Sequence, residues 1–175
     1  MEIPEAKGYS IWLLFEKNIE DFFQSIIYQL SSQFNSPEFI PHITLISRLE
    51  GNESELLKKF EQFSHLKSFK VETKKVSYSY EFYRSLFIEI DKSTELKNIF
   101  EFATKVFNIK IDFENFHPHI SLLYSFEKSE VKLKVIEKSL QDIPKEIKIS
   151  KMGFFKTKGR PEDWELLGVL KLKDC

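Results

Sequence analysis

The sequence contains little cysteine, glycine or proline. Its 175 residues include one cysteine, five glycines and six prolines. The single cysteine, Cys175, excludes an intrachain disulfide and any cysteine cluster that could hold zinc or an iron–sulfur centre. The scarcity of glycine and proline, without any Ser/Gly-rich tract, argues against linkers between independent units. We therefore expect one domain over residues 1–175, in a reducing compartment, the cytoplasm.

The sequence also lacks an excess of charge and long apolar runs. Its 26 Lys and Arg residues balance 27 Asp and Glu residues, so no global charge draws the protein to nucleic acid or to an anionic membrane. Apolar runs are only a few residues long, and no basic region followed by a long apolar stretch opens the chain. We expect no membrane contact and no secretion. The expected state is a monomer that binds any anionic ligand locally.

The apolar residues that are present recur with strand and helix spacing, which predicts an α+β fold. The first expected helix has its apolar stripe from Ile19 to Leu30, with Asn18 as a plausible cap. Two more are expected at 56–63 and at 96–107, the latter opened by Ser93 or Thr94. Strands are expected over 9–15, 42–46, 69–80, 86–90, 147–155 and 164–172.

The two halves of the sequence repeat one plan. A shift of 77 residues carries the segment Pro-His-Ile-Thr-Leu at 41–45 onto Pro-His-Ile-Ser-Leu at 118–122, together with apolar positions before it. This echo predicts an internal duplication, with each lobe built as strand, helix, motif strand, helix and further strand. The last two strands would complete the second sheet. The expected architecture is a bilobal duplicated fold, with two antiparallel sheets facing across a central cleft and helices outside.

Each repeated motif presents an imidazole beside a hydroxyl. Residues two apart on a strand share a face, so His42 projects with Thr44, and His119 projects with Ser121. One imidazole can take a proton from water while the other gives a proton to the departing oxygen of a cyclic phosphodiester. The hydroxyls can bind the non-bridging oxygens without a metal. A lone His-x-Thr motif carries little information. Two copies at matching places favour a catalytic role over the alternative, a structural remnant of an ancestral duplication that has lost its activity.

The remaining candidates are weaker. His65 is expected at the surface, and Pro118 interrupts the strand that would bring His117 into line with His119. Arg160, in a Gly- and Pro-containing turn, is interpreted as loop, with a phosphate contact as the alternative. The basic run between the motifs is interleaved with acids and is interpreted as a solvated face; it comprises Lys67, Lys70, Lys74, Lys75 and Arg84.

With these residues in view, the chain resembles the two-histidine phosphoesterase superfamily, most closely the cyclic phosphodiesterases of plants and yeasts that act on ADP-ribose cyclic phosphate. The resemblance rests on both motifs, on the opening strand at 9–13 and on the closing strand at 164–169. It implies a bilobal α+β fold with a water-filled cleft and no metal or organic cofactor. It also implies that Trp12 and Tyr124 line the cleft and bind substrate, although the residues alone favour core packing. Plant members carry several cysteines, which this chain lacks.

The resemblance further implies that His119 activates water and that His42 protonates the leaving group, although such a pair can exchange roles. The expected function is hydrolysis of ADP-ribose 1'',2''-cyclic phosphate, nucleoside 2',3'-cyclic phosphates, or both, to monophosphates. Two alternatives stay open. One is an RNA 2',3'-cyclic phosphodiesterase that processes RNA ends, and the other is a module that binds nucleotides without turnover.

Overall fold

The strands and helices of the computed structural model follow the predicted order closely. The structure describes all residues except 1, 128–130, 133, 135–136, 138 and 175. The strands are β1 (Tyr9–Phe15), β2 (Ile43–Leu49), β3 (Phe69–Tyr78), β4 (Leu86–Ile90), β5 (His119–Leu123), β6 (Glu146–Lys156) and β7 (Glu165–Lys171). The helices are α1 (Lys17–Phe34), α2 (Glu53–Glu61) and α3 (Thr94–Phe107). The helix expected after the second motif strand falls mainly on residues outside the described part.

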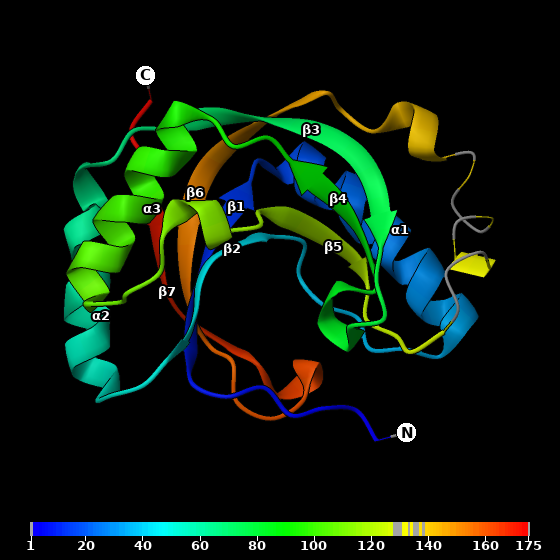
Figure 1. Ribbon diagram of the computed structural model, residues 1–175, viewed down its shortest axis with the longest axis horizontal. Helices are drawn as coiled ribbons and strands as arrows, with labels where there is room; N and C mark the ends of the chain where they lie inside the picture. The colour runs from blue at the N-terminus through cyan, green and yellow to red at the C-terminus, as the bar shows by residue number, and fades with distance from the viewer. Residues whose placement is uncertain (1, 128–130, 133, 135–136, 138, 175) are drawn as a thin grey trace.

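The strands form one antiparallel sheet that closes on itself. Its order is β1-β2-β5-β4-β3-β6-β7, and β6 also pairs with β1, so that the first six strands in this order make a ring (Figure 1). The ring has two narrow junctions. Between β2 and β5 only Ile43 and Ile120 are paired, and between β3 and β6 the pairing runs from Phe69 opposite Ile149 to Glu72 opposite Glu146.

The α+β class, the antiparallel strands and the outer helices are confirmed, but the connections between the halves differ from expectation. The two expected sheets are continuous, because β2 pairs with β5 and β3 pairs with β6. The last strands do not simply complete the second half. Strand β6 pairs along the whole of β1 in the first half, while β3 pairs with β4 in the second half. Each half therefore contributes its third strand to the other half.

The helices show the same exchange. Helix α1, from the first half, packs against β5, and α3, from the second half, packs against β2. Figure 1 shows α1 on one flank of the ring and α2 and α3 on the other. The Ser93 hydroxyl caps α3, as predicted, and accepts from the Leu96 amide at 3.2 Å. The Asn18 cap is wrong. Asn18 lies inside α1, which begins after Glu16, a residue without a side-chain cap.

Apolar side chains fill the space between helices and sheet. Ile11, Leu13 and Phe15 on β1 are fully buried, as are Phe23 and Leu30 on α1. This packing fixes the strands that carry the motifs, because a close-packed interior resists displacement of any one of its members. Among the described residues, no helix is both long and apolar enough to cross a membrane.

Candidate active site

His42 lies at the entrance to β2, and its ring is held on both sides. Its Nδ1 lies 2.6 Å from the Ile40 carbonyl oxygen, two residues upstream across Pro41. A carbonyl can only accept, so Nδ1 carries the proton and Nε2 is left as the acceptor of the neutral ring. The imidazole stacks on Trp12 with ring centroids 3.5 Å apart and an interplanar angle of 5°. Burial lowers the pKa of His42 to about 3, against the opposing hydrogen bond to Ile40, and the charge of His119 adds to the lowering.

His119 repeats this arrangement at the start of β5. Its Nδ1 lies 2.8 Å from the carbonyl oxygen of His117, again two residues upstream across a proline, which leaves Nε2 as an acceptor. The ring is less enclosed than that of His42, and it meets the edge of Phe87 at 5.3 Å. Burial lowers the pKa of His119, and the hydrogen bond to His117 opposes this. The positive charge of Arg84 lowers it further, whereas Glu81 raises it.

The pairing of β2 with β5 brings the two motifs together. Because Ile43 lies opposite Ile120 in an antiparallel pair, His42 is adjacent to Ser121, and Thr44 is adjacent to His119. These four residues alternate with the buried isoleucines, so all four face away from the core. They line one cavity of about 640 Å³. The sequence predicted that the two motifs would meet, but they meet as neighbours in one sheet and not across two sheets.

The two motif hydroxyls differ in their partners. The Ser121 hydroxyl donates to the carbonyl oxygen of Tyr83 at 2.9 Å, which ties β5 to the turn before β4. Within the described part of the chain, the Thr44 hydroxyl has no protein partner. Thr44 can therefore donate to an incoming anion without losing a bond, whereas Ser121 can donate to the anion only by giving up its bond to the Tyr83 carbonyl. The sequence did not distinguish them.

Trp12 and Tyr124 both reach the cavity, but each is 3% exposed. The Trp12 ring is covered by His42 on one face and by Phe155, at 3.8 Å, on the other. Tyr124 stacks on Phe39 at 3.6 Å, and burial raises the pKa of its hydroxyl, which stays protonated. Trp12 thus has no free face for a base and presents only its edge to the cavity. Their expected role in substrate binding stays a prediction.

The structure adds cavity residues that sequence reasoning missed. Arg84 was placed in a solvated basic run, yet it lines the cavity beside His119 and Ser121. The available signal was its position two residues before the strand at 86–90. That strand pairs with β5, which carries His119 and Ser121, so a residue at its end can reach the second motif. Trp164 also lines the cavity, and its buried Nε1 has no hydrogen-bond partner in the part of the chain that the structure describes. Lys7 and Arg48 are further lining cations.

The other sequence candidates lie outside the cavity. His65 is exposed, and its Nδ1 lies 2.7 Å from the Gln62 carbonyl oxygen. His117 is exposed and contributes its carbonyl, not its ring, to the site. Arg160 is exposed at the start of the short turn before β7. None of the three lines the cavity that holds His42 and His119.

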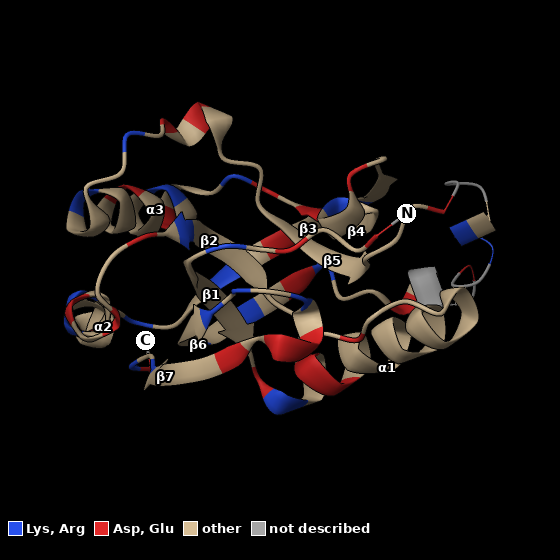
Figure 2. Cartoon of the chain, turned by 90° about the horizontal axis from the view of Figure 1, so that it is seen from below, with Lys and Arg blue, Asp and Glu red and all other residues tan. Residues whose placement is uncertain are grey.

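Much of the basic run between the motifs is neutralised by acids. Four of its members form ion pairs: Lys70 with Glu146, Lys74 with Asp91, Lys75 with Glu89 and Arg84 with Glu81. Figure 2 shows basic and acidic residues interspersed along the chain. Most of the cations in this run are therefore exposed and paired with acids, which weakens the case for binding a long polyanion.

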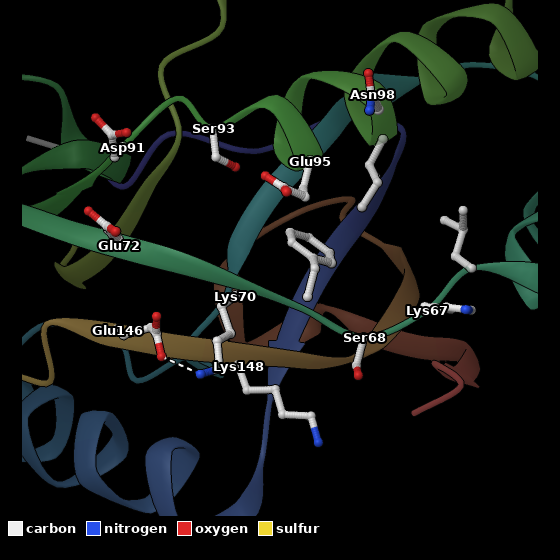
Figure 3. A pocket seen from close by; sticks show the side chains of 13 residues that line it. Lys67, Ser68, Lys70, Glu72, Asp91, Ser93, Glu95, Asn98, Glu146 and Lys148 are labelled. Atoms are coloured by element: carbon white, nitrogen blue, oxygen red, sulfur yellow. Dashed lines mark ion pairs between the residues drawn. The ribbon is translucent and has the colours of Figure 1, made fainter. Parts of the chain in front are cut away.

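A second hollow, of about 670 Å³, lies between β3, β6 and the first turn of α3 (Figure 3). Both signs of charge line it, including Lys70 and Glu146, which form an ion pair at 2.5 Å. It contains neither motif histidine. Among the described residues, no group of three or more His, Cys, Asp or Glu side chains could hold a metal ion. The cavity of about 640 Å³ that is lined by His42 and His119 is the candidate active site.

Comparisons with known proteins identify the family and support the fold. A family model described as cyclic phosphodiesterase-like protein matches residues 7–175. The cyclic phosphodiesterase of Arabidopsis thaliana is 27% identical over 182 residues, which cover 98% of this chain and 99% of the relative. The 2',3'-cyclic-nucleotide 3'-phosphodiesterase of Kluyveromyces lactis is 26% identical over 158 residues, covering 78% of this chain and 74% of the relative.

Solved structures support the fold. A Thermus thermophilus protein superposes with a TM-score of 0.62 at 12% identity, and the match covers 95% of this chain and 98% of that chain. E. coli LigT, solved in complex with 3'-AMP, superposes with a TM-score of 0.56 at 13% identity, covering 97% and 99%. At this level of identity the likeness concerns the arrangement of helices and strands.

Proposed function

Because the chain belongs to the cyclic phosphodiesterase-like protein family, we propose that it hydrolyses small cyclic phosphates to monophosphates. The proposed substrates are ADP-ribose 1'',2''-cyclic phosphate and nucleoside 2',3'-cyclic phosphates. One observation carries the proposal. The pairing of Ile43 with Ile120 brings two histidines into one cavity. Each has Nδ1 hydrogen-bonded to a backbone carbonyl and an Nε2 that no described residue contacts by a hydrogen bond.

The geometry supports a direct attack by water on phosphorus. One neutral imidazole takes a proton from the water through Nε2 as the new P–O bond forms. The other, as an imidazolium, gives its proton to the sugar oxygen as the old P–O bond breaks. The Thr44 and Ser121 hydroxyls lie beside the histidines and can hydrogen-bond the non-bridging oxygens, where negative charge increases in the transition state.

The histidine that acts as the acid must become protonated when the substrate is bound. Burial lowers the pKa of both histidines, so both are mainly neutral at pH 7 in the free protein. The negative charge of the bound phosphate stabilises an imidazolium and raises the pKa again. The family resemblance assigns the acid to His42 and the base to His119. Burial favours the reverse, because the less enclosed His119 is the easier ring to protonate.

The dependence of kcat/KM on pH separates the two assignments. An enzyme with both groups gives a bell-shaped profile, and removal of the base abolishes the limb at low pH, whereas removal of the acid abolishes the limb at high pH. His42→Gln and His119→Gln should each lower kcat by about 10²-fold to 10⁴-fold. The limb that each variant loses assigns its role.

The substrate class is tested with a panel of cyclic phosphates, with phosphorus NMR to identify which ester bond breaks. A cyclic mononucleotide should be hydrolysed at least as well as an RNA oligomer that ends in a cyclic phosphate. His65→Ala, which removes an exposed imidazole outside the cavity, is the matched control and should keep full activity. Binding of nucleotides without turnover of any cyclic phosphate would overturn the proposal.

A further inference from the structure

Arg84 lies next to His119 and has a role in neither motif. We propose that Arg84 binds the phosphate of the substrate on the His119 side of the cavity and exchanges its contact with Glu81 for phosphate oxygens. This inference rests on the proposed function and adds to it a specific anion-binding residue. It also assigns Glu81 as the counter-ion that competes with the substrate.

Arg84 lines the cavity, and its guanidinium has hydrogen-bond donors that are not engaged by the described residues. Its Nη2 donates to Glu81 Oε1 at 3.0 Å, and the Glu81 side chain is 67% exposed. Its Nε is buried and has no hydrogen-bond partner among the described residues. A buried donor without a partner is unfavourable, and an anion that reaches it gains a charge-assisted hydrogen bond. Arg84 therefore offers a phosphate its buried Nε–H donor and an Nη2–H donor whose present partner is a solvated carboxylate.

The backbone around Arg84 is fixed before any ligand arrives. The Arg84 carbonyl accepts from the Ser79 hydroxyl at 2.6 Å, and the preceding carbonyl, that of Tyr83, accepts from Ser121 at 2.9 Å. On the other side, the buried Lys132 donates to the Ser85 hydroxyl at 2.6 Å. The backbone that carries Arg84 therefore does not have to be ordered when the side chain binds an anion, which lowers the entropic cost of binding.

Arg84 is also linked to His119 through one ring. Its guanidinium carbon lies 5.5 Å from the centroid of the Phe87 ring, and the same ring meets His119 at 5.3 Å. The hydrolysis converts a singly charged phosphodiester into a monophosphate that carries up to two charges. A cation fixed at this place meets the charge that increases along the reaction.

The charges around His119 make the proposal measurable. Arg84 lowers the pKa of His119 and Glu81 raises it. The other ionisable groups that face it are His117 just before β5, His42 just before β2, and Glu89, which pairs with it from β4 and also contacts Lys75. Removal of Arg84 should therefore raise the pKa of His119, and removal of Glu81 should lower it.

The test uses binding and NMR on the full chain, and neither requires turnover. Affinity for inorganic phosphate and for adenosine 2'-monophosphate is measured by calorimetry, and the His119 ring proton is titrated by NMR. Arg84→Gln should weaken both ligands by about tenfold to hundredfold and raise the His119 pKa. Glu81→Gln should strengthen both ligands and lower the pKa. Arg160→Gln, which removes an exposed guanidinium outside the cavity, should change neither.

Wild-type affinity and an unchanged His119 pKa in a folded Arg84→Gln protein would overturn the inference. If that variant does not fold, Glu81→Gln decides alone. If the Arg84–Glu81 pair has only a structural role, Glu81→Gln should bind phosphate and adenosine 2'-monophosphate no more tightly than the wild type. Failure of the proposed function would be seen separately. In that case the wild-type protein would hydrolyse no cyclic phosphate, whether or not Arg84→Gln changes the affinity for phosphate.

Discussion

Ile43 and Ile120 lie directly opposite each other between β2 and β5, and they are also 77 residues apart, which is the shift that relates the two motifs. Residues equivalent by that shift can face each other only where a two-fold axis passes between them. The pairing of β3 with β6 obeys the same relation, because the pair Phe69–Ile149 becomes the pair Glu146–Glu72. This register supports the predicted duplication. It also places the two histidines symmetrically on either side of the axis.

Thr44→Ala and Ser121→Ala should have different effects on stability, although their hydroxyls are equivalent in the motifs. Loss of the Ser121 hydroxyl leaves the Tyr83 carbonyl without its donor and should lower the free energy of unfolding by about 1 kcal/mol. Loss of the Thr44 hydroxyl breaks no hydrogen bond to any described residue and should change the free energy of unfolding by less than about 0.5 kcal/mol. Both should lower kcat. Urea denaturation measures the difference, and equal destabilisation would contradict it.

Trp12→Ala should damage both folding and the site. The ring is 3% exposed between His42 and Phe155, so its loss should lower the free energy of unfolding by about 3–5 kcal/mol. Trp12→Phe keeps a ring against His42 and should cost less. Tyr28→Ala, at a side chain that is 60% exposed, is the control and should change stability by less than about 0.5 kcal/mol. Chemical denaturation and kcat together test whether the stacked ring supports His42.

Acid should destabilise the protein through His42. Its pKa is 6.5 in the unfolded chain and about 3 in the native state, so between these values the unfolded state binds the extra proton. The stabilisation is therefore complete above pH 6.5 and is lost as pH falls, by about 1.4 kcal/mol per pH unit. His42→Gln should lose less stability than the wild type between pH 6.5 and pH 4. Parallel losses in urea titrations across this range would show that native His42 is not held neutral.

Gly8→Ala should be more harmful than Gly51→Ala, although both glycines have positive φ angles of 78° and 140°. A Cβ at Gly8 would lie 2.4 Å from the Leu49 carbonyl oxygen, while a Cβ at Gly51 meets nothing closer than 3.8 Å. We expect the clash to cost about 1–3 kcal/mol, in addition to the backbone strain that a side chain meets at Gly8. Thermal unfolding of the two variants measures the difference. Equal losses would contradict the prediction.

The sequence predicted the local elements and the motif residues but not their connections. The run from Tyr9 to Phe15 and the apolar stripe from Leu96 to Phe107 form the expected strand and helix because periodicity is a local signal. Periodicity does not say which strand pairs with which. The exchange of β3 and β6 between the halves therefore could not be read from it, and neither could the single junction at Ile43 and Ile120.

The sequence predicted the motif residues of the site but not the other residues that line the cavity. His42, Thr44, His119 and Ser121 could be identified because they recur at matching positions, and the structure brings them into one cavity. The residue 77 positions before Arg84 is Lys7, which also lines the cavity but lies outside the strands and helices, so the echo between the motifs did not single out Arg84. The strong depression of the His42 pKa also depends on Trp12, which is 30 residues away in the sequence.

The exchange of third strands has a consequence for how the chain can be divided. A first half ending before β4 would keep β1 and β2 but lack β6, which pairs along the whole of β1, and its own β3 would have no β4 to join. The second half would be incomplete in the same way. Two such fragments can satisfy their edges only by assembling with each other, or with a second copy of themselves, in the manner of a domain-swapped dimer.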